Sequence, residues 1–303
     1  MHVDFNQVSL SGITVMHTAA KEGQVEILQY LHNEMHIDLN QSDNKGLTLA
    51  HVAAQSGHLE VLRYLYSMQI NLNQPEKMAG WVPAHSAAES GNIDVIKYLH
   101  KEAHIHLNQS SNTGFTLAHI AAQGGYLEIL RYLHDETDID LKQSDIEGVT
   151  PAHIAAECGK TDVLTYLHDE TTMDLNLNTI NGFTPAHFAI QNGHIDVLKY
   201  FHKLGIDFTQ RDKNNFTLTH FAARFGHINV LKYFHDELKI DLTQSTNTGF
   251  SPVHAAAQHG HVDVLKYFHE LKIDLTQSTS TGFTPVYFAT QYGHINVLKY
   301  FHE

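Results

Sequence analysis

The sequence predicts an all-α fold, a solenoid of stacked helix-turn-helix units with projecting β-hairpin loops. A glycine-to-histidine motif recurs in steps of 33 or 34 residues along the 303-residue chain. A period in this range is typical of repeat architectures. Each unit also contains two segments whose apolar residues have helical spacing. One such unit cannot bury its apolar face alone, so the prediction requires that neighbouring units stack.

The motif divides the chain into nine units without a linker between them. Its first copy spans residues 12–17, and Tyr287 replaces the histidine in the last copy. We predict a single repeat array over residues 1–303 that opens with a partial repeat in residues 1–11. The units begin at Gly12, Gly46, Gly80, Gly114, Gly148, Gly182, Asn215, Gly249 and Gly282.

Each unit is predicted to begin with a short helix. In the fifth unit, Thr150 can accept a hydrogen bond from the first helical turn, and Pro151 suits the first helical position, which needs no N–H donor. The Ala155 and Ala156 pair keeps the packing face small, and Gly159 ends the helix. In the other units Thr or Ser usually takes the first of these positions, and proline often follows it.

A longer amphipathic helix and a hairpin complete the unit. Residues 194–202 place Ile195, Leu198 and Phe201 at helical spacing. The polar, irregular stretch at residues 37–45 predicts a projecting hairpin that leads to the next glycine.

The unit resembles the ankyrin repeat. Residues 182–189 read Gly-Phe-Thr-Pro-Ala-His-Phe-Ala and are followed by Gly193 and His194. The resemblance covers nearly the whole chain. Alanine usually replaces the family's leucine before the histidine, and the glycine after the second helix survives only at Gly205. We expect a different hairpin setting but the same ankyrin-repeat α-solenoid.

The composition argues against several classes of protein. The 19 Lys and Arg against 33 Asp and Glu give a net charge of −14 without a basic block, which argues against nucleic-acid binding. The longest apolar run, residues 286–289, is far shorter than the ~20 residues of a membrane helix. Cys158 is the single cysteine, and the first residues lack a signal-peptide pattern. We expect an intracellular protein, located in the host cytosol if it is a secreted effector.

Most of the 26 histidines occupy repeat positions. Eight lie in the motif, eight end the second helices and five follow the glycine between the helices. Stacking spreads equivalent residues ~8–10 Å apart, so they do not converge as metal ligands. The pairs His32/His36 and His100/His104 lack an evident third ligand, and we predict no metal site. The resemblance implies that each motif histidine bridges its threonine hydroxyl and the backbone of the neighbouring unit.

The histidines at the ends of the second helices have two interpretations. They cap the last carbonyls of these helices. Alternatively, they form a ladder whose titration changes stability or partner binding between pH 5 and 7. Thermal midpoints across this range, compared with a ladder variant carrying glutamine, distinguish the two.

No sequence motif for catalysis occurs. The glycine-rich nucleotide, phosphate-loop, nucleophile-elbow and zinc-protease patterns are all missing from the sequence. An active site needs unlike groups in one unrepeated constellation, which a repeated sequence does not favour. Cys158 stands where other units carry Ser56, Gly124 or Asn192, and we interpret it as a small filler. We predict no enzymatic activity and no cofactor.

The resemblance implies that partners meet the hairpin tips and the exposed side of the first helices, along a concave groove. The residue after the motif glycine is apolar in all nine units, and it either packs on the adjacent hairpin or anchors a partner. A second column, just before the glycine between the helices, becomes aromatic near the C-terminus. The predicted partner-binding residues are Trp81, Phe115, Phe183, Phe216, Arg224, Phe225, Phe250, His259, Phe283 and Tyr292.

We therefore expect a scaffold that binds a partner protein along this groove without catalysis. The alternative is a targeting segment that recruits substrates for a larger effector or enzyme, from an intracellular bacterium or a large virus. The resemblance also suggests that an asparaginyl hydroxylase modifies Asn40 or Asn176. Because Val297, Leu298 and Phe301 have no following unit to cover them, we expect further repeats or a capping domain at either end.

Overall fold

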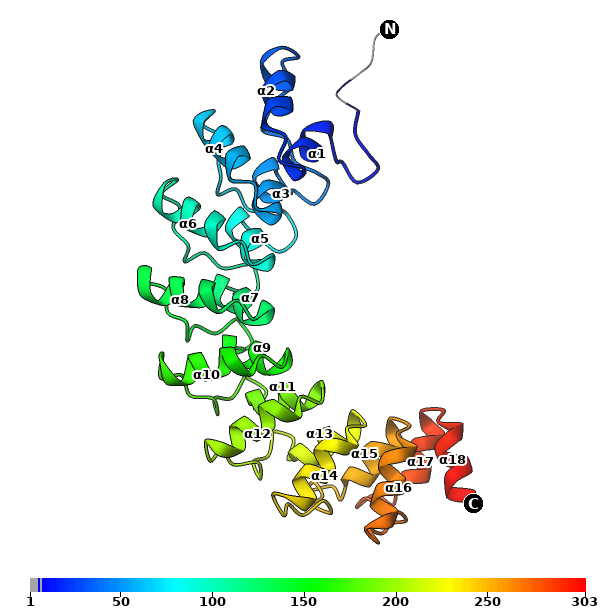
Figure 1. Ribbon diagram of the computed structural model, residues 1–303. Helices are drawn as coiled ribbons and strands as arrows, with labels where there is room; N and C mark the ends of the chain where they lie inside the picture. Colours follow the sequence, from blue (N-terminus) through cyan, green and yellow to red (C-terminus); the bar gives the residue numbers. More distant parts are fainter. Residues whose placement is uncertain (1–4, 6) are drawn as a thin grey trace. The chain divides into compact units, whose positions relative to one another are not determined.

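The computed structural model describes residues 5 and 7–303, so the predicted partial repeat at residues 1–11 lies partly outside the described residues. Within them, eighteen helices form nine pairs (Figure 1). The first helices of the pairs are α1 (Val15–Lys21), α3 (Leu49–Ser56), α5 (Pro83–Glu89), α7 (Leu117–Gly124), α9 (Pro151–Glu157), α11 (Pro185–Gln191), α13 (Leu218–Arg224), α15 (Pro252–Gln258) and α17 (Pro285–Gln291). The second helices are α2 (Val25–Asn33), α4 (Leu59–Ser67), α6 (Ile93–Lys101), α8 (Leu127–Glu136), α10 (Thr161–Asp169), α12 (Ile195–Lys203), α14 (Ile228–Asp236), α16 (Val262–Glu270) and α18 (Ile295–His302). The predicted all-α fold is confirmed.

The connections between repeats are hairpin loops with very little β structure. The structure records isolated antiparallel bridges between Ser42 and Thr48 and between Arg211 and Thr217, and no strand forms in the part of the chain it describes. Where the family's glycine after the second helix is missing, other residues take up its left-handed backbone, as His36 (φ 54°) and Lys239 (φ 55°) do. This is the altered hairpin setting that the sequence predicts.

The chain divides into two compact units, unit 1 at residues 1–146 and unit 2 at residues 147–303. In each unit, the first helix of a repeat packs on the first helix of the next repeat and on the second helix of its own. Each repeat thus supplies part of its neighbour's core, as solenoid stacking requires. The single array over residues 1–303 stays a prediction.

The core of each repeat combines small residues on the first helix with large ones on the second. Ala121 and Ala122 of α7 are fully buried, and Ala155 and Ala156 of α9 repeat the pattern. On the second helices, one fully buried position changes type along the chain. It holds Leu65, Leu99, Leu133 and Leu167, and then Phe201, Phe234 and Phe268.

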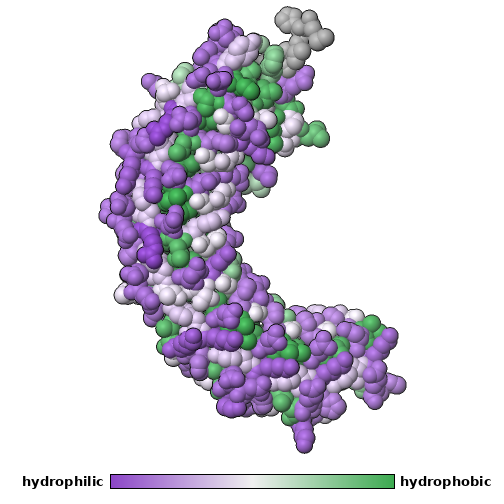
Figure 2. Space-filling view, in the orientation of Figure 1, coloured by the Kyte–Doolittle hydropathy of each residue, from purple (hydrophilic) through white to green (hydrophobic). Residues whose placement is uncertain are grey.

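Apolar side chains also reach the surface in the first and last repeats. Leu10, Ile13 and Val15 are exposed, and Figure 2 shows green apolar patches over α1 and the loop before it. In the last helix, Val297 is fully buried, whereas Leu298 and Phe301 are half-buried. Ile295 of the same helix is 63% exposed.

None of the described helices combines the length and the apolar character needed to cross a bilayer.

Candidate functional site

The motif histidines connect successive repeats. His220 Nδ1 accepts a hydrogen bond from the Thr217 N–H at 3.1 Å and lies 2.7 Å from its hydroxyl oxygen. Its Nε2 donates to the Phe250 carbonyl of the next repeat at 3.0 Å. The predicted bridge between the N-terminal hydroxyl and the neighbouring backbone is therefore confirmed here. The same bridge occurs at His17, His51, His153 and His254.

Burial keeps these histidines neutral. Desolvation lowers the pKa of His220, His187 and His85 to about 4 in each case. A neutral ring suits the bridge, because Nδ1 must keep its lone pair to accept from the backbone. Protonation at Nδ1 would remove that acceptor inside a buried interface.

A second histidine position forms a bridge that the sequence analysis did not assign. His227 Nε2 donates to the Gln191 carbonyl at the end of α11, at 3.0 Å. This carbonyl belongs to the last turn of a helix, where acceptors lack a partner within the helix. His58, His194, His261 and His294 reach back to the preceding repeat in the same way.

Two of the histidines at the ends of the second helices have different partners from those predicted. His100 Nδ1 lies 2.8 Å from the Tyr132 hydroxyl, and His269 Nδ1 lies 3.0 Å from the Tyr300 hydroxyl. At these two positions carbonyl capping is wrong, because the tyrosine of the next repeat's second helix offers a nearer partner. No group of three or more His, Cys, Asp or Glu side chains that could hold a metal occurs among the residues that the structure describes.

The residues after the motif glycine differ in exposure. Val149 is 8% exposed and belongs to the core, whereas Phe283 is 39% exposed. Trp81 and Phe115, in unit 1, are half-buried, and each ring stacks on the motif histidine of its own repeat, with centroids 5.9 and 4.8 Å apart. Packing on the motif imidazole thus accounts for much of this column's burial.

In unit 2 the same column lines a cavity of about 370 Å³. It is lined by the first helices α13 and α15, by the hairpin before α13 and by the residue after α17. Six of the ten predicted partner-binding residues line it, namely Phe183, Phe216, Arg224, Phe250, His259 and Tyr292. Phe225 and Phe283 lie outside the lining, and Trp81 and Phe115 belong to unit 1.

The apolar wall of the cavity is a cluster of phenylalanine rings. The Phe216 and Phe250 centroids lie 5.8 Å apart with the rings at 70°, and Phe183 meets Phe221 edge-on at 5.5 Å. Phe250 also meets Phe288 at 5.3 Å. These edge-to-face contacts are favourable arrangements of aromatic rings. Sequence reasoning missed Phe221 and Phe288, although the residue after the motif histidine changes from Val52, Ser86 and Ile120 in unit 1 to phenylalanine in three repeats of unit 2.

Polar groups lie at the rim of the cavity. The exposed Arg224 guanidinium lies 5.5 Å from the Phe225 ring centroid. Burial, and then the charge of Arg224, lower the pKa of His259, so its imidazole is neutral at neutral pH. Asp212 is buried, and its Oδ1 accepts hydrogen bonds from the N–H groups of Asn214 and Phe216 at 2.9 and 2.8 Å. Arginine is therefore the charged group that the cavity offers to a ligand at neutral pH.

Comparison with family models accounts for the repeats. A model of ankyrin repeats in three copies matches residues 1–76, 68–145, 135–212 and 219–303, and a second ankyrin-repeat model matches residues 193–235. The chain belongs to the ankyrin-repeat family. The comparison with curated proteins returns no match. Ankyrin repeats are generally protein-protein interaction modules, and the family is typically a non-catalytic scaffold.

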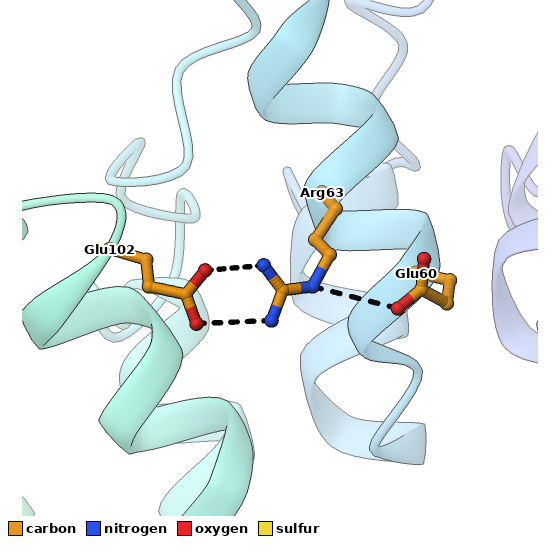
Figure 3. A network of polar contacts seen from close by, with 3 residues as sticks. All are labelled: Glu60, Arg63 and Glu102. Atoms are coloured by element: carbon orange, nitrogen blue, oxygen red, sulfur yellow. Dashed lines mark hydrogen bonds and ion pairs between the residues drawn. The ribbon is translucent and has the colours of Figure 1, made fainter.

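The second helices of this ankyrin protein carry charged contacts between repeats, away from the cavity. In unit 1, the Arg63 guanidinium of α4 bonds both carboxylate oxygens of Glu102, which follows α6, and its Nε lies 3.5 Å from Glu60 (Figure 3). Lys101 pairs with Glu136 of α8 at 2.9 Å. These side chains are exposed, so the pairs add little to stability.

Proposed function

We propose that this ankyrin protein is a scaffold that binds a partner protein along the first helices and hairpins of unit 2. The cavity between α13 and α15 is the centre of the proposed surface. The proposal includes no catalytic step, and it places the protein inside the cell. We also propose that residues 1–303 form a single repeat array.

One observation carries the proposal. The aromatic column after the motif glycine and the column before the next glycine meet in one cavity, with Phe216, Phe250 and Tyr292 beside Arg224. Aromatic residues and arginine provide most of the energy in protein interfaces. Repeat stacking needs the alanines and leucines of the core but not an arginine or a tyrosine at this rim. Tyr292 remains 51% exposed, and Arg224 is also exposed.

Site-specific photo-crosslinking tests the proposed surface. A photoreactive amino acid at position 292, in place of Tyr292, lies at the rim of the cavity. The matched control places it at Lys203, exposed at the end of α12 in the same unit. We expect partner protein to crosslink from position 292 and not from position 203. Crosslinks from position 203 alone would place the partner on the second helices and contradict the proposal.

A further inference from the structure

The Arg224 guanidinium differs from those of Arg63 and Arg211 because its contact among the described residues is with an aromatic ring, that of Phe225, and not with a hydrogen-bond acceptor. Arg63 bonds Glu102, and Arg211 donates to the carbonyls of Asn215 and Ser245 and to a glutamine. Arg224 makes no side-chain hydrogen bond or ion pair with any residue that the structure describes, although it lines the cavity. Its donors are therefore available to a ligand.

Other rim groups are also available. The side chains of Gln258, His259 and Tyr292 make no hydrogen bond with any part of the chain that the structure describes. The acidic group in the lining, Asp212, already holds the turn before α13. The rim thus presents donors and one positive charge next to an aromatic wall. Sites that bind a specific ligand have this composition, with an apolar lining and a few placed polar groups.

We propose that this cavity binds an aromatic side chain in a linear peptide segment of the partner, and that Arg224 binds an Asp or Glu carboxylate next to it. The inference rests on the proposed function of the same surface. The volume of about 370 Å³ is more than twice that of a cavity of ~150 Å³ that holds benzene. An aromatic ring entering it meets Phe216, Phe221 and Phe250 at their faces or edges.

The carboxylate follows from the chemistry of the guanidinium. Arginine's planar fork matches a carboxylate with two parallel hydrogen bonds, and no acidic side chain among residues 5 and 7–303 pairs with Arg224. A peptide segment fits better than a free small molecule, because the repeat that carries Tyr292 also exposes Phe283 and Tyr287, whose rings stack with centroids 4.2 Å apart. A ligand confined to the cavity would leave that surface uncovered.

Selection from a displayed library of random linear dodecapeptides tests the inference with the full chain. We expect the enriched peptides to carry Phe, Tyr or Trp within two residues of Asp or Glu. They should be enriched on the wild type and on the control Lys203→Gln, and not on Arg224→Gln. Because Arg224 is exposed and unpaired, Arg224→Gln should keep the thermal midpoint of the wild type, which a melting curve checks.

Fluorescence anisotropy with one selected peptide then isolates the charge pair. Replacing the peptide's acidic residue by its amide should raise Kd at least tenfold on the wild type, since hydrogen bonds between charged groups are strong. The same replacement should change Kd less than threefold on Arg224→Gln. Equal effects on both proteins, or enriched peptides without the aromatic-acidic pair, would overturn the inference.

Two further outcomes separate the inference from the proposed function. If N-acetylphenylalanine competes as strongly as the peptide, the cavity is a small-molecule site and the peptide inference is wrong. If a partner crosslinks from position 292 but no aromatic-acidic peptide is enriched, the scaffold function stands and this inference fails. If position 292 gives no crosslink, the proposed function fails first.

Discussion

Units 1 and 2 are built from the same repeat but differ in how their repeats join. In unit 1, Trp81 and Phe115 each stack on the motif histidine of their own repeat. The second helices of unit 1 are joined by ion pairs such as that between Lys101 and Glu136. In unit 2, Phe216 and Phe250 meet across the repeat boundary and form a cavity wall. The comparison shows that positions not needed for stacking decide where a cavity forms.

The ion pairs of the second helices also differ between the units, because those of unit 2 lie within one helix. In unit 2, Asp196 and Lys199 pair within one helix at 3.8 Å, and Asp263 and Lys266 do so at 4.0 Å. Such pairs do not join repeats. Unit 2 instead fills its second helices with larger side chains, since Phe201, Phe234 and Phe268 take the place of leucine. Its stability should therefore depend more on apolar packing than that of unit 1.

The largest expected effect is acid unfolding, and it should occur in both units. The folded state lowers the pKa of His187 and His220 in unit 2, and of His85 in unit 1, from 6.5 to about 4. The unfolded chain therefore binds more protons between pH 6.5 and 4, and stability falls as the pH falls through this range. Each of these histidines should cost about 3 kcal/mol at pH 4, because one pKa unit corresponds to about 1.4 kcal/mol.

Hydrogen exchange at pH 7.5, 6 and 5, corrected for intrinsic rates, measures this loss of stability in each unit. Protection should fall in α5, α11 and α13. His187→Gln should weaken the pH dependence of unit 2, and the exposed His104→Gln serves as the control. Unchanged protection between pH 7.5 and 5 would contradict the prediction.

Truncation of the core position on the second helices should give the next largest effect. Phe234→Ala should lower the free energy of unfolding by about 3–5 kcal/mol, and Leu99→Ala by about 2–5 kcal/mol, because both side chains are fully buried. Urea unfolding followed by circular dichroism measures both variants. The single tryptophan, Trp81, reports on unit 1. A Phe234→Ala transition that is unchanged by circular dichroism would contradict the packing argument.

The sequence was sufficient to predict the fold because stacking constrains many positions at once. The threonine, proline and glycine of each unit define the first helix, and the recurring motif histidine indicates the link to the next unit. His220 and Phe250 show that this link also holds the backbone of the aromatic column. The regular spacing therefore predicted both the repeat and one wall of the cavity.

The rest of the cavity could not be predicted from the residues that follow the motif glycine. Phe221 lies one residue after a motif histidine, where Ala255 and Ile120 show no common type, so its role depends on the neighbouring rings. Val149 occupies the same column as Phe183 but is buried, which the sequence does not indicate. Nor does the sequence show that Arg224 lacks a partner, because pairing depends on side chains from other repeats.

A glycine substitution at the turn between helices should have an intermediate effect, and its size should depend on which side chain of the next repeat lies against the glycine. Gly193 has a φ of 71°, and a Cβ there would lie 2.7 Å from His227 Nδ1. Gly193→Ala should cost about 2–3 kcal/mol, because it combines backbone strain with displacement of a bridging ring. In unit 1, Gly57 has a φ of 80°, but its Cβ would meet the Asn92 amide at the longer distance of 3.1 Å. Gly57→Ala should cost about 1–2 kcal/mol. Urea unfolding ranks the two, and the reverse order would contradict the role of the ring.

The smallest effect on stability is expected for the exposed ion pair that Arg63 forms in unit 1. Its guanidinium bonds Glu102 through two donors, but its side chain remains 42% exposed and that of Glu102 remains 52% exposed. Water and salt solvate both groups well in the unfolded chain, so Arg63→Gln should leave the thermal midpoint close to that of the wild type. Melting curves at low and high salt check this. A drop in the thermal midpoint as large as that of Gly57→Ala would mean that the stability of unit 1 depends on the ion pairs of its second helices. Units 1 and 2 would then differ in what stabilises them as well as in their proposed binding surface.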